Sequence, residues 1–287
     1  MQRNHLLHLV RSQLISRKQI YALLNWDPTL EKISHYSSQQ IASKLKIDES
    51  LAKNIQNSLY CPNIKQQIEN EQKQCHIITI FDSSYPKLLK KIVDAPLVLY
   101  CIGDLSLLNK WPIISIIGSR HPSDEAWDKL QLIVPDLIKN NWIIVSGLAK
   151  GIDSFAHKMT LNEKGKTIAV LGSGFNYIYP KENRGVFHLI QNRGLVISEY
   201  PPETPPRKYQ FPERNRIISG LSLATLVVEA RKRSGTLITV DQALEQGKDI
   251  FAIPGSPLIK QTVGCNQLIQ DGAKLVINAN DIHGEWF

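Results

Sequence analysis

The fold of this chain follows from three stretches of sequence, IISIIGSR (113–120), WIIVSGLAKGID (142–153) and TIAVLGSG (167–174). In each of them, an apolar run of strand length is followed directly by glycine and small hydroxyl residues. Continuous apolar runs are typical of strands that are buried on both faces of a parallel sheet. The pattern continues in three further runs, LVIS (195–198), LATLVVE (223–229) and IFAI (250–253). Because segments of helical length separate the runs, the sequence predicts an α/β fold with an extended Rossmann-like, doubly wound and mostly parallel sheet.

Composition places the chain among globular proteins. Its 287 residues are 43% hydrophobic and 21% charged, so disorder is not expected to dominate. No apolar run approaches the roughly 20 residues of a membrane-spanning helix, and the start lacks a signal-peptide pattern. The four cysteines form no CxxC pair, which excludes a zinc ribbon and fits a reducing compartment. We therefore expect a cytoplasmic protein with no membrane association, and the net charge of +8 favours an anionic partner.

Glycine and serine follow nearly every predicted strand. Glycine lets a ligand approach the backbone closely, and the helix that follows offers free N–H groups to an anion. Because the carboxyl ends of parallel strands lie at one edge of the sheet, these turns are expected to meet there. The predicted phosphate-binding edge comprises Gly118, Ser119, Ser146, Gly147, Gly172, Ser173 and Gly174.

The common nucleotide-binding motifs are absent from these turns. A dinucleotide fingerprint needs G-x-G-x-x-G, and Tyr177 stands where the third glycine would follow Gly172 and Gly174. No G-x-x-x-x-G-K-[ST] run and no GxSxG elbow occur. The eight histidines are scattered, and none lies at ligand spacing from a cysteine or another histidine. The sequence therefore predicts no cofactor, no metal site and no catalytic serine.

Cations and aromatic residues occupy the same turns. Arg120 ends the first turn, and Lys181 follows the YP of the third. Lys208 and Phe211 lie in the proline-rich segment after the fourth strand. Cations bind phosphates and aromatic rings stack on bases, so this combination favours single-stranded nucleic acid.

Six stretches occur in an order and spacing that point to one family: GSR (118–120), SGLAKGIDSFAH (146–157), AVLGSGFNYIYPKEN (169–183), FPERNRIISGLS (211–222), VVEARKRSGTLIT (227–239) and FAIPGS (251–256). GCNQLIQDGA (264–273) fits the end of the same domain. From about residue 76 to 277 the chain resembles the DNA-processing protein A family, DprA, also called Smf. The resemblance implies a homodimeric, non-enzymatic recombination mediator that binds and protects incoming single-stranded DNA. It also implies that the protein helps to load the RecA recombinase during natural transformation.

The resemblance implies roles for single residues. Arg120 of the GSR turn is similar to the main DNA-contacting arginine of the family. Lys208 and Phe211, in K-x-x-F spacing, resemble the lysine and the base-stacking ring of its DNA pocket. Lys181 resembles another basic contact, and the glycines and serines of the predicted edge would shape the pocket.

Asn215 and Arg216 are further candidates for the DNA site. They either contact DNA or hold the loop that carries Phe211. Arg214 or Arg216 also has the alternative of an internal ion pair with Glu213 or Glu229.

The remainder of the chain predicts the domain organisation. Apolar residues recur at helical intervals in the first part, as in Leu6, Leu9, Leu14, Ile41, Leu45 and Ile55. We expect a helical domain over residues 1–64, loosely similar to a helix-hairpin-helix or sterile-alpha-motif bundle, and the Rossmann-fold DNA-binding domain over residues 65–287. The hairpin glycine is missing at 45–48, which leaves open whether the bundle contacts DNA or serves in docking or capping. Many family members carry a C-terminal winged helix, for which we expect no room before Phe287.

Two other functions remain open. The same type of Rossmann fold resembles nucleotide phosphoribohydrolases with a PGGxGTxxE motif, but Thr239 stands at the position of its glutamate. Such an enzyme would lose roughly 10²–10⁴-fold without that general acid or base. Glu199 and Glu229 could replace it, because both lie near strand ends. The other alternative is a sensor of small nucleotides, although cations spread over several turns suit a strand better than one compact ligand.

Overall fold

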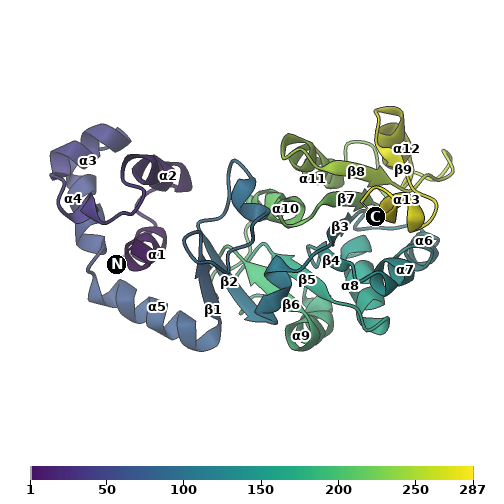
Figure 1. The fold of residues 1–287 in the computed structure, drawn as a ribbon, viewed down its shortest axis with the longest axis horizontal. Helices are drawn as coiled ribbons and strands as arrows, with labels where there is room; N and C mark the ends of the chain where they lie inside the picture. The colour runs from purple at the N-terminus through teal and green to yellow at the C-terminus, as the bar shows by residue number, and fades with distance from the viewer. Residues whose placement is uncertain (1, 287) are drawn as a thin grey trace. The chain divides into compact units, whose positions relative to one another are not determined.

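The computed structural model describes residues 2–286, which form two compact units (Figure 1). The first unit comprises residues up to Ser83 together with Pro96–Leu99. The second comprises Ser84–Ala95 and the chain from Tyr100 onward. The boundary that the sequence predicts at residue 64 lies inside a helix of the first unit, Pro62–Gln74.

The first unit is a bundle of short helices. Its elements are α1 (Gln2–Ser12), α2 (Arg17–Trp26), η1 (Lys32–Ser34), α3 (Ser38–Leu45), α4 (Glu49–Ser58), α5 (Pro62–Gln74) and β1 (His76–Thr79). Ser16 and Ser37 cap α2 and α3, each accepting a hydrogen bond from a backbone N–H of the first turn. The turn between α3 and α4 forms without glycine, because Lys46 adopts the left-handed conformation with φ of 54°.

The second unit contains a mostly parallel sheet. Its strands are β2 (Val98–Gly103), β3 (Ile113–Ile117), β4 (Ile143–Ser146), β5 (Thr167–Leu171), β6 (Leu195–Ser198), β7 (Ala224–Val227), β8 (Asp249–Ala252) and β9 (Lys274–Leu275), with β2 reaching across the unit boundary. They lie in the order β2-β6-β5-β4-β3-β7-β8-β9. All neighbours pair in parallel except β2 and β6, which are antiparallel. The predicted α/β, Rossmann-like fold is confirmed.

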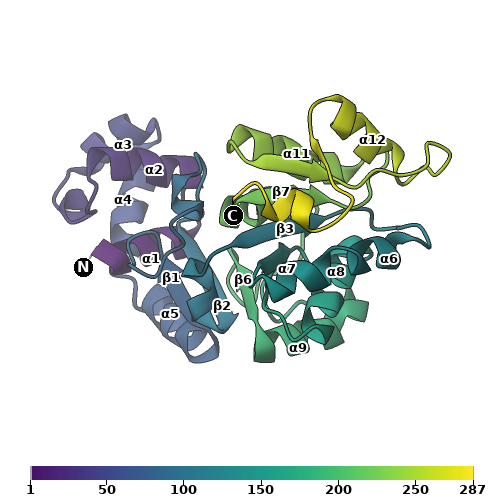
Figure 2. The same cartoon turned by 45° about the vertical axis from the view of Figure 1, so that its right-hand side comes forward.

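Helices cover both faces of this sheet. They are α6 (Ala126–Gln131), α7 (Val134–Lys139), α8 (Ile152–Asn162), α9 (Arg184–Arg193), α10 (Gln210–Leu221), α11 (Gly235–Glu245), α12 (Val263–Gln270) and α13 (Asn280–His283), with short 3₁₀ turns η2 (Leu89–Lys91), η3 (Leu105–Asn109) and η4 (Lys181–Asn183). Figures 1 and 2 show α10 and α11 on one side of the strands and α6 to α9 on the other. One continuous core joins Ile114 and Ile144 of the sheet to Leu137, Trp142 and Ala156 of the helical layer. Because both faces are covered, the strands are apolar throughout.

The strand order has a topological switch point beside β3. From β3 the chain continues to β4, β5 and β6 on one side, and it returns to β7 on the other. Ligands of open α/β sheets bind at such a point, in the crevice beyond the carboxyl ends of the strands. The turn after β3 and the turn after β7 therefore flank the expected binding crevice. Within residues 2–286, no helix is long and apolar enough to cross a membrane.

Candidate nucleic-acid interface

The turn after β3 carries an exposed cation, Arg120, beside a buried serine whose hydrogen bonds hold the backbone. Ser119 is buried, and its backbone N–H donates to Glu229 O at 2.8 Å. The Ser119 hydroxyl accepts from the backbone N–H of His121 at 3.1 Å. Arg120, which lies between them, is exposed, and its guanidinium has no hydrogen bond or ion pair within the described chain. The fold therefore holds the backbone of this turn and leaves the arginine available to a ligand.

The turn after β4 is held between two buried charges. The carboxylate of Asp153 accepts from the backbone N–H groups of Gly147 at 3.2 Å and Ala149 at 3.4 Å. The guanidinium of Arg214 donates to Gly147 O and to Val170 O. Burial raises the pKa of Asp153, an effect that the charge of Arg214 opposes. Burial also lowers the pKa of Arg214 to about 10, so Arg214 stays charged at neutral pH.

Arg214 connects this turn to the aromatic part of the site. Its Nε donates to Asn215 Oδ1 at 3.1 Å, which places Asn215 as a support for Arg214. Phe211 lies one helical turn earlier on α10 and is partly exposed. Its ring lies so close to Gly172 that a Cβ there would come within 2.9 Å of it, so glycine is required at this position. Tyr179 lies beside Phe211, with ring centroids 5.5 Å apart.

The hydroxyl residues of the predicted edge are occupied within the protein. Ser146 Oγ donates to Ile116 O at 2.6 Å, across to the neighbouring strand. Ser173 Oγ donates to Tyr177 O at 2.8 Å and thereby closes the third turn. Both serines are buried, so they shape the backbone of the edge.

The predicted cations fall into two groups. Lys181 and Lys208 are exposed, and neither side chain has an ion-pair or hydrogen-bond partner among residues 2–286. Arg216 is only 6% exposed and forms ion pairs with Glu199 at 2.8 Å and Asp94 at 3.2 Å. Of the two partners that the sequence allows for Arg216, Glu213 contributes only its backbone carbonyl, at 2.9 Å, and Glu229 binds elsewhere. The Arg216 guanidinium therefore ties the middle of α10 to the segments that carry Asp94 and Glu199.

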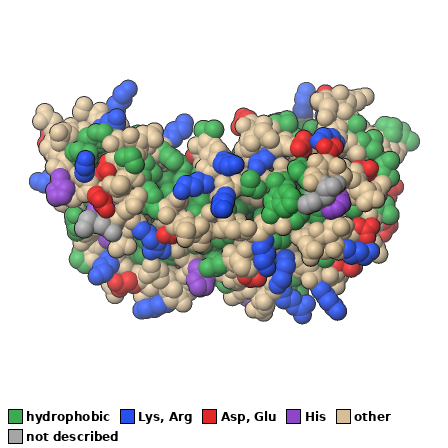
Figure 3. Space-filling model, in the orientation of Figure 1, with side chains coloured by type: hydrophobic (Ala, Val, Ile, Leu, Met, Phe, Trp, Pro, Cys, Tyr) green, Lys and Arg blue, Asp and Glu red, His purple; other side chains and the backbone are tan. Residues whose placement is uncertain are grey.

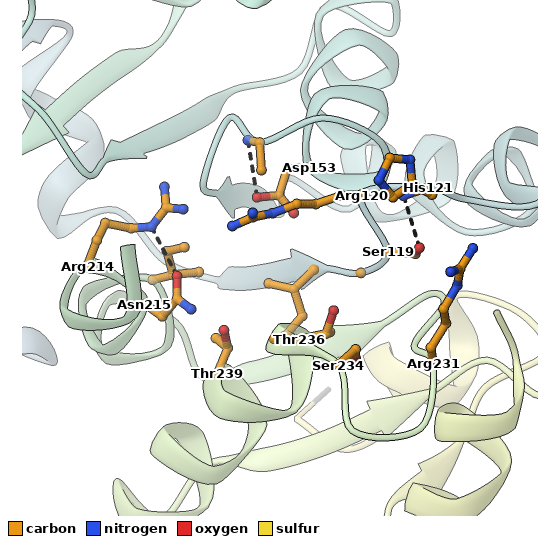
Figure 4. Close-up of a pocket in the computed structure, with 15 residues that line it drawn as sticks. Ser119, Arg120, His121, Asp153, Arg214, Asn215, Arg231, Ser234, Thr236 and Thr239 are labelled. Carbon is orange, nitrogen blue, oxygen red and sulfur yellow. Dashed lines mark hydrogen bonds between the residues drawn. The ribbon is translucent and has the colours of Figure 1, made fainter. Parts of the chain in front are cut away.

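Basic side chains alone do not single out this edge. Figure 3 shows Lys and Arg on many parts of the visible surface, including over α8 and α9. A cavity of about 450 Å³, lined by Lys164, Lys166 and Arg193 among others, opens at the opposite edge, whereas two adjoining cavities with shared lining residues open here. The larger of these two has a volume of about 280 Å³ and lies at the switch point, between the turns after β3 and β7 (Figure 4). The smaller, of about 60 Å³, is lined by Lys150, Tyr179 and Phe211 among others, and Arg120, Ala149 and Arg214 line both.

The carboxylates that an enzyme could use are engaged in ion pairs. Glu229 is fully buried, accepts from Lys129 Nζ at 2.7 Å, and receives the backbone N–H and the hydroxyl of Ser123. Glu199 binds Arg216. Thr239, at the position of the hydrolase glutamate, lines the larger cavity. No cluster of potential metal ligands occurs in the part of the chain that the structure describes.

Sequence reasoning missed two residues of the site, and it missed the contacts of Arg214. Asp153 and Arg214 are buried charges that bind backbone groups of other turns, and Tyr179 becomes a neighbour of Phe211 only through the fold. The sequence signal for Asp153 is its place in the first turn of α8, where the free backbone N–H groups of the helix stabilise a carboxylate.

Comparison with known proteins identifies the family. Residues 76–286 match the family model described as DNA recombination-mediator protein A, which includes every predicted site residue from Gly118 to Arg216. The chain belongs to this family. The predicted resemblance, and with it the assignment to a DNA-processing recombination mediator, is confirmed.

Curated relatives and solved structures agree. The chain is 39% identical over 267 residues to DNA processing protein DprA of Bacillus subtilis, covering 92% of this chain and 89% of that one. It is 47% identical over 208 residues to DprA of Streptococcus pneumoniae, covering 72% and 73% of the two chains.

The X-ray structure of DprA from Streptococcus pneumoniae matches with a TM-score of 0.89 and 37% identity, over 100% of this chain and 99% of that one. DNA processing protein A from Helicobacter pylori, whose structure concerns its single-stranded DNA binding mode, matches with a TM-score of 0.65 and 30% identity. That match covers 74% of this chain and 95% of the other.

Proposed function

We propose that this protein binds single-stranded DNA at the carboxyl edge of its sheet, protects the strand and helps to load RecA onto it. The observation that carries the proposal is that exposed Arg120 and the partly exposed ring of Phe211 line one cavity at this edge. Lys181 and Lys208, exposed and without partners among residues 2–286, stand on the segments that follow β5 and β6 at the same edge. The cations contact phosphates and the ring stacks on a base, which requires unpaired bases and gives little sequence preference. The known binding mode of the Helicobacter pylori relative supports the same ligand for this chain.

The protein acts in this proposal as a cytoplasmic homodimer, by binding and not by catalysis. The ion pairs of Glu199 and Glu229 support this part, because a carboxylate engaged with a buried cation is poorly placed to transfer protons. A nucleotide phosphoribohydrolase is therefore the less favoured function.

The test compares two double variants by fluorescence anisotropy with a labelled oligo-dT and a matched duplex. Arg120→Gln/Lys208→Gln removes two cations of the carboxyl edge. Lys164→Gln/Lys166→Gln removes two exposed cations from the turn before β5, at the opposite edge of the sheet. We expect tight, single-strand-selective binding by wild type and the control. In the first variant, the slope of log affinity against log salt falls by about 1.4, since each lost phosphate contact accounts for about 0.7. Equal binding by all three proteins, or equal losses in both variants, would refute the site.

A further inference from the structure

The larger cavity at the switch point holds features that strand binding at Phe211 does not use. It is lined from one side by the turn after β3, with Arg120 and His121, and from the other by the turn after β7. The second turn contributes Arg231 and the first residues of α11 (Figure 4). The cavity therefore lies between a helix N-terminus and two arginines.

Ser234, at the N-terminus of α11, has an unused hydroxyl. It occupies the N-cap position, with φ of −84° and ψ of 159°, yet its side chain makes no capping hydrogen bond. In the same molecule, the N-cap residues Ser16 and Ser37 both accept from their helices, as such serines ordinarily do. The Oγ of Ser234 is buried in the cavity wall and has no partner within residues 2–286. A buried polar atom without a partner is costly, and because the half-buried Ser234 lines the cavity, rotation of its side chain would bring the Oγ to a ligand bound there.

The backbone at the start of α11 is open to the same space. Gly235 and Thr236 both line the cavity, and a helix leaves the N–H groups of its first turn without intrahelical partners. A Cβ added at Gly235 would meet nothing within 4 Å, so the glycine leaves room beside the helix terminus. This arrangement is suited to an anion that accepts from both backbone and hydroxyl.

The charge of the cavity matches a doubly charged anion. Arg120 and Arg231 are exposed, and within the described chain neither forms an ion pair. Arg214 and Asp153 also line the cavity, but their opposite charges offset each other. The lining therefore carries two uncompensated positive charges. A phosphate monoester carries −1.5 to −2 at neutral pH, whereas a phosphodiester within a strand carries only one negative charge.

We propose that this cavity binds a phosphate monoester, as found at the end of a DNA strand or on a free nucleotide. Ser234, the first turn of α11, Arg120 and Arg231 are the groups that contact it. A volume of about 280 Å³ leaves room for the attached sugar. Because Arg120 and Ala149 also line the smaller cavity with Phe211, a strand held by its terminal phosphate would continue directly to the stacking ring. The strand-end form of this inference rests on the proposed function, and the nucleotide form does not.

The first experiment compares labelled oligo-dT with a 5′-phosphate, with a 3′-phosphate and with two hydroxyl ends. We expect one phosphorylated end to bind about tenfold more tightly, as one or two charge-assisted hydrogen bonds would give. Arg231→Gln/Ser234→Ala abolishes this preference and leaves the affinity for the hydroxyl-ended strand unchanged within twofold. Lys232→Gln is the matched control, because it removes an equal charge from the neighbouring exposed position, which does not line the cavity. A preference that survives in Arg231→Gln/Ser234→Ala overturns the assignment.

The second experiment measures binding of thymidine monophosphate and of thymidine by calorimetry, with wild type and the same two variants. We expect the monophosphate alone to bind, and Arg231→Gln/Ser234→Ala to lose it. If wild type binds no oligonucleotide but binds the monophosphate, the proposed function fails and the cavity assignment stands. If all strand ends bind equally and the monophosphate binds no better than thymidine, the cavity assignment fails while the proposed function stands.

Discussion

The two edges of the sheet both carry exposed cations, but they are built differently. At the amino edge, basic side chains precede β4, β5 and β6 on the surface, namely Lys139, Lys164, Lys166 and Arg193. Their contacts are local, as in Lys139 with Asp136, or are made to a backbone carbonyl, as in Lys166 with Arg193 O. At the carboxyl edge, buried Asp153 and Arg214 form hydrogen bonds to the backbone of a turn that lies beside exposed cations. Two cavities and the aromatic pair of Tyr179 and Phe211 lie at the same edge. Positive charge and a cavity occur at both edges, since Lys164, Lys166 and Arg193 line a cavity of about 450 Å³ at the amino edge, whereas the buried charges of Asp153 and Arg214 support turns of the carboxyl edge.

The largest expected effect is on the free energy of unfolding, through the buried charges that hold the turn after β4. Arg214→Met removes the cation that faces buried Asp153 and that binds the carbonyls of Gly147 and Val170. Breaking a buried charge pair by removing one partner costs about 3–5 kcal/mol. We expect a loss of this size in the free energy of unfolding from urea titration. Arg193→Met at the amino edge is the control and should change stability by less than about 0.5 kcal/mol. Similar losses in both variants would show that the two edges do not differ in this way.

The aromatic pair gives the next effect, on binding and not on stability. Phe211→Ala removes the ring that lies over Gly172 and beside Tyr179. Stacking of one base on an aromatic side chain contributes about 1–3 kcal/mol, so oligo-dT affinity should fall by a corresponding factor with the salt dependence unchanged. Phe211→Tyr keeps a stacking face and should bind nearly as wild type does. A loss in Phe211→Ala that also flattens the salt dependence would indicate displaced cations instead.

A third prediction concerns pH and a buried histidine of α8, which packs against the amino ends of β4 and β5. The Thr167 hydroxyl donates to Ile144 O, so the Nδ1–H of His157 donates to Thr167 Oγ1, at 2.7 Å. Burial, with the charge of Arg214 adding to it, lowers the pKa of His157 to about 3, so the ring is neutral at pH 7. Because unfolded histidine takes up a proton near pH 6.5 and the folded protein does not until about pH 3, this residue destabilises the fold as the pH falls through that window. Between pH 7 and pH 5 the contribution is about 2 kcal/mol.

His157→Gln should remove that part of the acid sensitivity. Urea unfolding of wild type and variant at the two pH values measures it as a difference of differences. Asp153, whose raised pKa favours the folded state on acidification, is present in both proteins and cancels. An unchanged pH dependence in His157→Gln would mean that the ring is not kept neutral.

The sequence predicts the fold and the position of the edge well, because both depend on local patterns. An apolar run followed by glycine and serine is visible within a few residues, and parallel pairing brings such turns together. The partners of the buried charges, by contrast, cannot be predicted from local patterns. Arg216 pairs with Asp94 and Glu199, and Glu229 with Lys129, across 122, 17 and 100 positions of the chain. A nearby carboxylate such as Glu213 is therefore a poor guide to the partner of a buried arginine.

The smallest expected effect compares two exposed ion pairs, one from each edge. Lys150 and Glu182 at the carboxyl edge are 2.6 Å apart, and Lys139 and Asp136 at the amino edge are 2.7 Å apart. In both, the acidic partner raises the pKa of the lysine. Glu182→Gln frees Lys150, which lines the cavity with Phe211, to contact a phosphate.

Oligo-dT affinity in Glu182→Gln should rise about twofold at low salt, with a salt slope steeper by up to about 0.7. Asp136→Asn frees Lys139 in the same way and should leave affinity and slope as in wild type, because no strand passes that edge. An equal gain in both variants would mean that strand binding responds to overall charge, and the distinction between the edges would not hold for the ligand.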